Sequence, residues 1–220
     1  MPAVHERPPA RVLRTQQGVA RRPAWEIALL FPDQGQWSEE EYLDLDSNLL
    51  VEFTDGNIEV LPMPTFSHQR ITLWLLQRLL AFVEARDLGE VLFAPLPVRV
   101  APRVYREPDI LFVSRNHADW EEDRCAAGAD LVVEVVSPSN KKRDLVQKRA
   151  EYARAKIPEY WIVNPQDGTV RVLNLKGRTY EERKFVAGEQ ATSRVLDGFQ
   201  VAVTDLFNSA SKPRERRKKS

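Results

Sequence analysis

One charged residue, Glu134, stands in the centre of the apolar run Leu131–Val136. A run this apolar predicts a strand that is buried on both faces of a sheet. A lone buried carboxylate is unstable unless it is protonated, paired or bound to a metal ion, so Glu134 needs a partner. A salt bridge to a core lysine or arginine, or an edge strand that exposes one face, would satisfy it structurally. The residues around it favour a role in chemistry.

Asp109 is the second candidate, because Pro108-Asp109 opens another predicted strand at 109–113. Proline is tolerated at a strand start, where its missing N–H does no damage. Taken alone, Asp109 is typical of a turn or a cap. Beside Glu134 on a neighbouring strand, it would complete a carboxylate pair suited to Mg²⁺, with Mn²⁺ as an alternative. Such an ion can polarise a phosphodiester and acidify a bound water.

Phosphodiester hydrolysis also calls for a cation near the developing charge. Two residues after Glu134, where a side chain would share its face of the strand, the chain has Val136. The next candidate is Lys148, which shares one helical face with Leu145 and Tyr152 and is therefore predicted to point inward. The alternative is a lysine that buries its stem and keeps its charged end in water.

Other candidates carry weaker signals. Glu52 precedes a predicted hairpin turn and could equally face solvent, and His68 stands at a predicted helix start, where surface or capping roles are common. The basic cluster 141–143 could contact a nucleic-acid backbone or lie in a solvated loop. The adjacent aromatics at 160–161 are more typical of a core than of a base-stacking platform.

Composition bounds the class of protein. The chain has 220 residues with 32 basic and 32 acidic side chains, so its net charge gives no argument for nucleic-acid binding. Its one cysteine, Cys125, excludes an intrachain disulfide and a cysteine-rich zinc site, which fits a cytoplasmic location. We expect a flexible tail at 1–36, one domain at 37–208 and a basic tail at 209–220. The second tail could serve solubility or contact phosphates.

Periodicity predicts the elements that must position these residues. Helical spacing and a capping serine predict a short helix and a long helix, and Asp55-Gly56 between two apolar runs predicts a hairpin. The order predicts an α/β fold, a mixed sheet with helices against it. The predicted helices are 39–45, 67–86 and 143–156, and the predicted strands are 50–53, 58–61, 91–100, 109–113, 131–136, 160–163 and 170–175.

Short motifs occur along the chain in a characteristic order: Glu52–Gly56, His68-Gln69, Pro108–Val113, Asp130–Ser139, Arg143-Asp144 with Lys148, Tyr152, and Ile157–Pro165. Together they resemble the Uma-type family of putative restriction endonucleases, a branch of the PD-(D/E)xK nuclease superfamily. The resemblance covers roughly residues 37–207. It implies a restriction-endonuclease-like core with a central mixed sheet flanked by helices, a divalent metal such as Mg²⁺, and a homodimer.

The resemblance also implies roles for single residues. Asp109 and Glu134 would be the metal ligands, Lys148 the catalytic lysine, and Glu52 a supporting acid. His68 falls where the family carries a histidine near the site. Val136 departs from the broad superfamily, which has lysine there, and Lys148 on the next helix would replace it.

These observations predict a metal-dependent endonuclease that hydrolyses phosphodiester bonds in DNA. The alternative is a catalytically inactive module of the same fold that binds DNA or forms a dimer. A glycosidase with paired carboxylates is disfavoured, because it leaves Lys148 unexplained and the chain lacks the aromatic density of a sugar cleft.

Overall fold

The computed structural model describes residues 31–46, 49–137 and 143–211. The helical segments are α2 (Glu39–Leu43), α3 (Phe66–Glu84), η1 (Arg115–Trp120), η2 (Arg143–Lys148), α4 (Arg149–Arg154) and α5 (Val203–Asn208). The strands are β1 (Val51–Thr54), β2 (Asn57–Val60), β3 (Gly89–Phe93), β4 (Val98–Ala101), β5 (Val104–Arg106), β6 (Ile110–Ser114), β7 (Leu131–Val135), β8 (Glu159–Asn164), β9 (Thr169–Lys176), β10 (Thr179–Phe185), β11 (Gln190–Thr192) and β12 (Gln200–Ala202).

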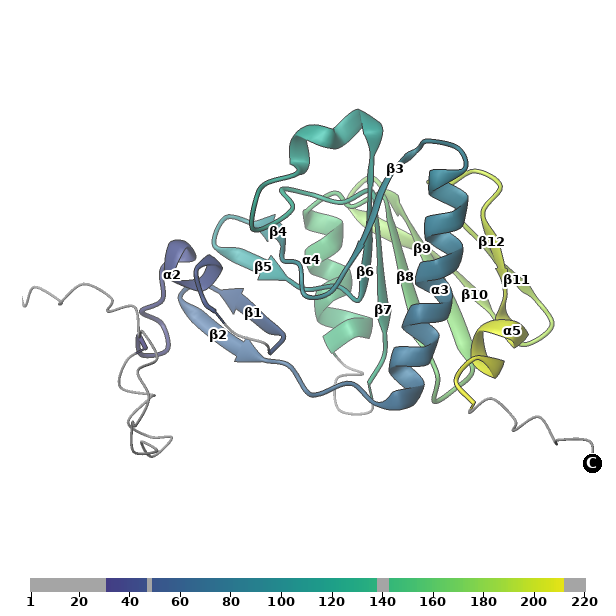
Figure 1. Ribbon diagram of the computed structural model, residues 1–220, viewed down its shortest axis with the longest axis horizontal. Coiled ribbons are helices and arrows are strands. Elements are labelled where there is room, and N and C mark those ends of the chain that lie inside the picture. The colour runs from purple at the N-terminus through teal and green to yellow at the C-terminus, as the bar shows by residue number, and fades with distance from the viewer. Residues whose placement is uncertain (1–30, 47–48, 138–142, 212–220) are drawn as a thin grey trace, which may run out of the picture. The chain divides into compact units, whose positions relative to one another are not determined.

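A six-stranded sheet in the order β10-β9-β8-β7-β6-β3 forms the centre of the fold. Only β7 and β8 pair in parallel, and the other neighbours are antiparallel. One face packs against α3 and α5, and the other packs against α4 (Figure 1). The mixed sheet flanked by helices confirms the predicted fold class. All five residues of β7 are buried, as expected for a strand covered on both faces.

A second sheet, in the order β2-β1-β5-β4, carries Glu52. Its own core contains Trp37, Tyr42, Phe53 and Tyr105. The hairpin between β1 and β2 turns at Asp55 and Gly56, which both have positive φ, at 45° and 84°. A Cβ at Gly56 would lie 2.6 Å from the Gly35 oxygen, so this turn needs glycine. The predicted hairpin is therefore confirmed.

The predicted strand 91–100 is wrong: two strands of different sheets, β3 and β4, occupy it. Pro95 and Pro97 lie between them, and the backbone turns there through a cis Ala94-Pro95 bond. Proline cannot donate to a strand ladder, so the chain leaves the central sheet at this point. β5, which was not predicted, then pairs with both β1 and β4.

The predicted helix 143–156 divides into a π-helical segment, η2, and the α-helix α4. Apolar spacing over so few residues does not separate a π-helix from an α-helix. The strand β10 was also missed, since only Tyr180 and Phe185 of its seven residues are buried. Its run of charged residues hides the strand pattern, as is common where a strand ends a sheet.

The tails at 1–30 and 212–220 and the basic residues 141–142 lie outside the described residues, so the proposed tail boundaries stay predictions. Within the described part, Gln34 donates to the Ile58 carbonyl at 3.0 Å and accepts from the Ile58 N–H at 2.9 Å. No helix that the structure describes has the length and apolar character to span a membrane.

Candidate active site

The ends of β6 and β7 bring Asp109 and Glu134 to the same place. Ile110 pairs with Val133 in the antiparallel ladder, so the next position sets Asp109 opposite Glu134. Asp109 Oδ2 accepts a hydrogen bond from the Val135 N–H at 2.7 Å, which anchors its carboxylate to β7. Both side chains are largely buried, with exposed fractions of 14% for Asp109 and 7% for Glu134.

Lys148 reaches Glu134 from the helical segment that follows β7. Its Nζ lies 2.6 Å from Glu134 Oε1, and the same oxygen accepts a hydrogen bond from the Tyr152 hydroxyl at 2.7 Å. The Lys148 side chain is 3% exposed, so its charged end does not lie in water. The prediction that Lys148 and Tyr152 share an inward face is confirmed.

Glu52 connects this group to the second sheet. Its Oε1 lies 3.0 Å from Lys148 Nζ, and its Oε2 lies 3.5 Å from Arg106 Nε. The side chain is 1% exposed, so the solvent-facing interpretation of Glu52 is wrong. Lys148 therefore lies between Glu134 of the central sheet and Glu52 of the second sheet.

Arg106 extends the chain of charges to the surface. Its guanidinium makes a bidentate pair with Glu151, at 2.7 and 2.8 Å, and also donates to the Phe53 carbonyl and the Thr54 hydroxyl. Glu151 lies three residues after Lys148, so Arg106 fastens the start of α4 to β1. Arg106 and Glu151 line a surface cavity of about 490 Å³. The contacts form a series of alternating charges that holds Lys148 in place: Glu134, Lys148, Glu52, Arg106 and Glu151.

His68 contacts the other carboxylate of the site. Its Nε2 lies 3.3 Å from Asp109 Oδ2, and its side chain is 13% exposed. The first turn of α3 supplies this position, because the Thr65 hydroxyl caps the helix by accepting from the His68 N–H at 3.2 Å. The ring is largely buried and contacts Asp109, so the alternative that His68 is only a surface residue at a helix start is wrong.

The charges around Tyr152 keep its hydroxyl protonated. Complete burial raises the pKa of Tyr152 well above its ordinary value, and the negative charge of Glu134 raises it further. The hydroxyl therefore acts as a donor to Glu134 throughout the neutral pH range. Lys148 and Tyr152 together satisfy Glu134 Oε1 inside the protein.

A further buried acid, Glu107, lies next to this group. Its Oε2 accepts from the Val51 N–H at 3.0 Å, and the side chain is 7% exposed. Burial raises the pKa of Glu107 from 4.5 to about 7, with Glu52 adding to the rise, although the hydrogen bond from Val51 opposes it. The folded protein therefore binds this proton more tightly than the unfolded chain does.

The elevated pKa of Glu107 predicts how stability depends on pH. A raised folded-state pKa favours the folded state below pH 4.5, and that contribution is lost as the pH rises to about 7. We expect Glu107→Gln to raise the free energy of unfolding by up to about 3 kcal/mol at pH 8 and much less at pH 5. Urea unfolding of metal-free protein in EDTA measures this, with exposed Glu90→Gln as the control. An equal gain at both pH values would contradict it.

The donor set at Asp109 and Glu134 fits a hard divalent cation. Carboxylate oxygens are the ligands that Mg²⁺ prefers, and one or two of them suffice because the ion keeps several waters. Within the described ranges, no group of three or more histidine, cysteine, aspartate or glutamate side chains is arranged to hold a metal ion. A metal here would therefore rest on two carboxylates and water.

The structure thus joins Glu52, Glu134 and Lys148 by direct contacts and joins Asp109 to His68. Sequence reasoning missed three charged groups, Arg106, Glu107 and Glu151. The available signal was the pair Arg106-Glu107 directly before Pro108-Asp109, between Val104-Tyr105 and the apolar run 110–113. The aromatic pair Tyr160-Trp161 is core, as predicted, with 0% and 1% exposure.

Comparison with solved structures supports the fold. The chain is similar to the crystal structure of a putative nuclease belonging to DUF820 from Anabaena variabilis, with a TM-score of 0.67 and 18% identity. The match covers 82% of this chain and 100% of the other. Comparison with curated proteins gave no significant match. The model of the Uma2 family, described as putative restriction endonucleases, matches residues 39–204, and the chain belongs to this family.

Proposed function

We propose that the protein is a divalent-metal-dependent endonuclease that hydrolyses phosphodiester bonds in DNA. The observation that carries the proposal is the position of Lys148, whose Nζ lies 2.6 Å from Glu134 and 3.0 Å from Glu52 within the protein. Membership of a family described as putative restriction endonucleases supports the same reaction. Burying Lys148 between two acids costs desolvation free energy, and apolar residues of similar size would fill the same space at a lower cost. The arrangement, with Asp109 nearby, therefore favours a functional role for Lys148.

Each residue has a part in this reaction. Asp109 and Glu134 would hold the cation, which when bound polarises the phosphodiester and acidifies a water. Lys148, which contacts two carboxylates, would hydrogen-bond the attacking water or a phosphate oxygen as negative charge develops there. Glu52 orients Lys148, and His68 orients the Asp109 carboxylate through its 3.3 Å contact.

Nicking of supercoiled plasmid tests the proposal. We expect purified protein to nick plasmid DNA with Mg²⁺ or Mn²⁺ and to leave it intact in EDTA. Glu134→Gln keeps the size of the side chain and is expected to abolish the metal-dependent part. The matched control is Glu159→Gln, since Glu159 is a glutamate with 0% exposure that accepts from the Trp161 indole and the Arg194 N–H, away from the site.

Cleavage that is equal in EDTA and Mg²⁺, or equal in wild type and Glu134→Gln, would contradict the proposal. Calorimetric titration with Mn²⁺ gives a second measurement, with binding expected to depend on both Asp109 and Glu134. The homodimer stays a prediction that follows from the family resemblance, and sedimentation velocity measures it directly.

A further inference from the structure

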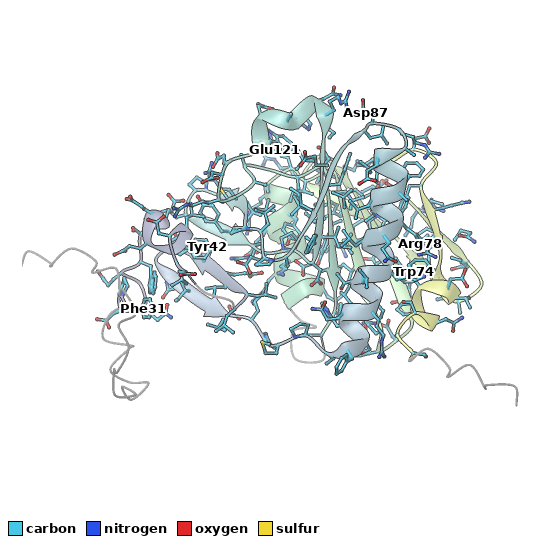
Figure 2. The ribbon with its side chains drawn as sticks, in the orientation of Figure 1. Phe31, Tyr42, Trp74, Arg78, Asp87 and Glu121 are labelled. Carbon is cyan, nitrogen blue, oxygen red and sulfur yellow. The ribbon has the colours of Figure 1, made fainter. Side chains whose placement is uncertain are left out.

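Helix α3 carries a ridge of alternating aromatic and arginine side chains. Residues four apart on a helix form a continuous ridge along its surface. The members of this ridge, which we call the arginine ridge, are Phe66, Arg70, Trp74, Arg78 and Phe82 on α3 and Arg86 in the turn that follows the helix. At about 1.5 Å per residue the helical part of the ridge, from Phe66 to Phe82, rises about 24 Å, and it winds partway round the helix because each step of four residues turns by about 40°. Figure 2 shows two of its members, Trp74 and Arg78, side by side on α3.

Each arginine of the ridge lies over the aromatic ring that precedes it. The guanidinium carbon of Arg78 is 3.4 Å from the centre of the Trp74 ring, that of Arg86 is 3.9 Å from Phe82, and that of Arg70 is 5.7 Å from Phe66. Stacking of this kind holds the planar guanidinium in one orientation before any ligand arrives. Less side-chain entropy is then lost when its N–H groups bind an anion.

The charge of the ridge is not neutralised within the described part of the chain. There, the three guanidinium groups donate to the backbone carbonyls of Ala210, Trp74 and Phe82, and none pairs with a carboxylate. Arg78 and Arg86 are exposed, and Phe66 has an exposed fraction of 83%. From Phe66 to Arg86 the only acidic residue is Glu84. The ridge is therefore a positive surface even though the whole chain has no net charge.

The ridge begins beside the candidate active site. Its first member, Phe66, lies two residues before His68, which contacts Asp109 from another side of the same helical turn. Arg70 Nη1 donates to the Ala210 carbonyl at 3.2 Å, so the segment after α5 contacts this end of α3. A polyanion that contacts Arg70 would therefore lie near the end of α3 that carries His68.

We propose that the arginine ridge of α3 binds the phosphodiester backbone of duplex DNA and guides the substrate to the site. The choice of DNA rests on the proposed function. Exposed guanidinium groups that are pre-oriented and lack carboxylate partners suit phosphate oxygens. Because the ridge carries almost no acids, the ridges of two copies of the chain would repel each other, which argues against a self-contact through this surface. Contacts with phosphates carry no sequence information, so the ridge sets affinity and register.

The test measures binding and cleavage separately. Fluorescence anisotropy with a labelled duplex of about 30 base pairs in EDTA reports affinity across a series of salt concentrations. We expect the triple change Arg70→Gln, Arg78→Gln and Arg86→Gln to weaken binding by at least about tenfold at low salt. The slope of log affinity against log salt should fall by about one for each arginine that contacts a phosphate.

Two controls separate this role from a structural one. Arg183→Gln removes an exposed arginine that lies 5.0 Å from the Phe185 ring on β10, and it should leave both affinity and slope unchanged. The triple change to lysine keeps the charge and should retain most of the salt slope. The single variant Arg78→Gln serves if the triple variant does not fold, with a loss of at least about threefold expected.

Affinity that is unchanged in the glutamine variants, or lost equally in Arg183→Gln, would overturn the ridge proposal. So would a change from dimer to monomer in the triple variant by sedimentation velocity, because it would assign the ridge to a self-contact. A wild-type protein that binds duplex through the ridge but never nicks plasmid would contradict only the proposed nuclease function. A protein that nicks plasmid with ridge-independent affinity would contradict only the ridge.

Discussion

Replacing Lys148 with methionine is expected to lower the rate of metal-dependent plasmid nicking by about 10³-fold. Methionine keeps the unbranched apolar stem and removes the ammonium, which lies 2.6 Å from Glu134 and 3.0 Å from Glu52. The cation that would steady the transition-state charge is then lost. The measurement is the initial rate of nicking with Mg²⁺ at a temperature where circular dichroism shows the variant folded.

Lys148→Met also leaves two acids facing each other inside the protein. The side chains of Glu52 and Glu134 have exposed fractions of 1% and 7%, so we expect the free energy of unfolding to fall by about 3–5 kcal/mol. The matched control is the double variant Lys148→Met with Glu52→Gln, which should recover part of the stability and none of the activity. Nicking within a few-fold of wild type in the single variant would show that Lys148 is only structural.

Replacing Arg106 with glutamine is the second large effect that we expect. Its side chain is 6% exposed and contacts both Glu52 and Glu151, so its removal breaks the bidentate pair with Glu151 and leaves Lys148 as the cation beside Glu52. We expect the free energy of unfolding, measured with urea, to fall by about 3–5 kcal/mol. The nicking rate should fall as well, with a larger effect on kcat than on KM, because the start of α4 loses its attachment to β1 and Lys148 becomes less well placed.

A matched control exists in the exposed pair of Arg99 and Glu122. Arg99 also makes a paired contact with a glutamate, at 2.7 and 3.2 Å, but the two side chains are 36% and 43% exposed. Water screens such a pair, so Arg99→Gln should cost less than about 1 kcal/mol and leave nicking unchanged. Equal losses in Arg99→Gln and Arg106→Gln would mean that burial of the Arg106 network has no special effect.

Local signals explain which elements could be predicted from the sequence. The capping box of Ser38 and Glu41 that starts α2, the Asp55-Gly56 turn and the helical spacing in α3 each depend on neighbours within a few residues. The apolar run of β7, interrupted only by Glu134, likewise predicts a buried strand. Errors arose where long-range pairing decides the structure. Strand β5 exists because β1 and β4 flank it, and its three residues carry no strand pattern of their own.

The candidate site divides in the same way. Glu134 stood out because a charge in an apolar strand needs a partner, and Lys148 because its helical face is otherwise apolar. The sequence does not distinguish Glu134 from Glu159, another buried acid, which backbone and indole N–H groups satisfy without any cation. Nor could spacing reveal Arg106, whose partners Glu52 and Glu151 lie far from it along the chain.

The sequence by itself predicted that Glu134 and Lys148 are inward-facing groups of opposite charge, because apolar residues stand beside each of them, and it left open that the charged end of Lys148 lies in water. Only the tertiary structure decided that they meet, and that Glu52 joins them from a different sheet. The physical reason is that a charge pair depends on the packing of α4 against two sheets, whereas periodicity reports only which face of one element is buried. The opposition of Asp109 and Glu134 likewise depends on the register of β6 against β7, which the pairing of the whole sheet sets.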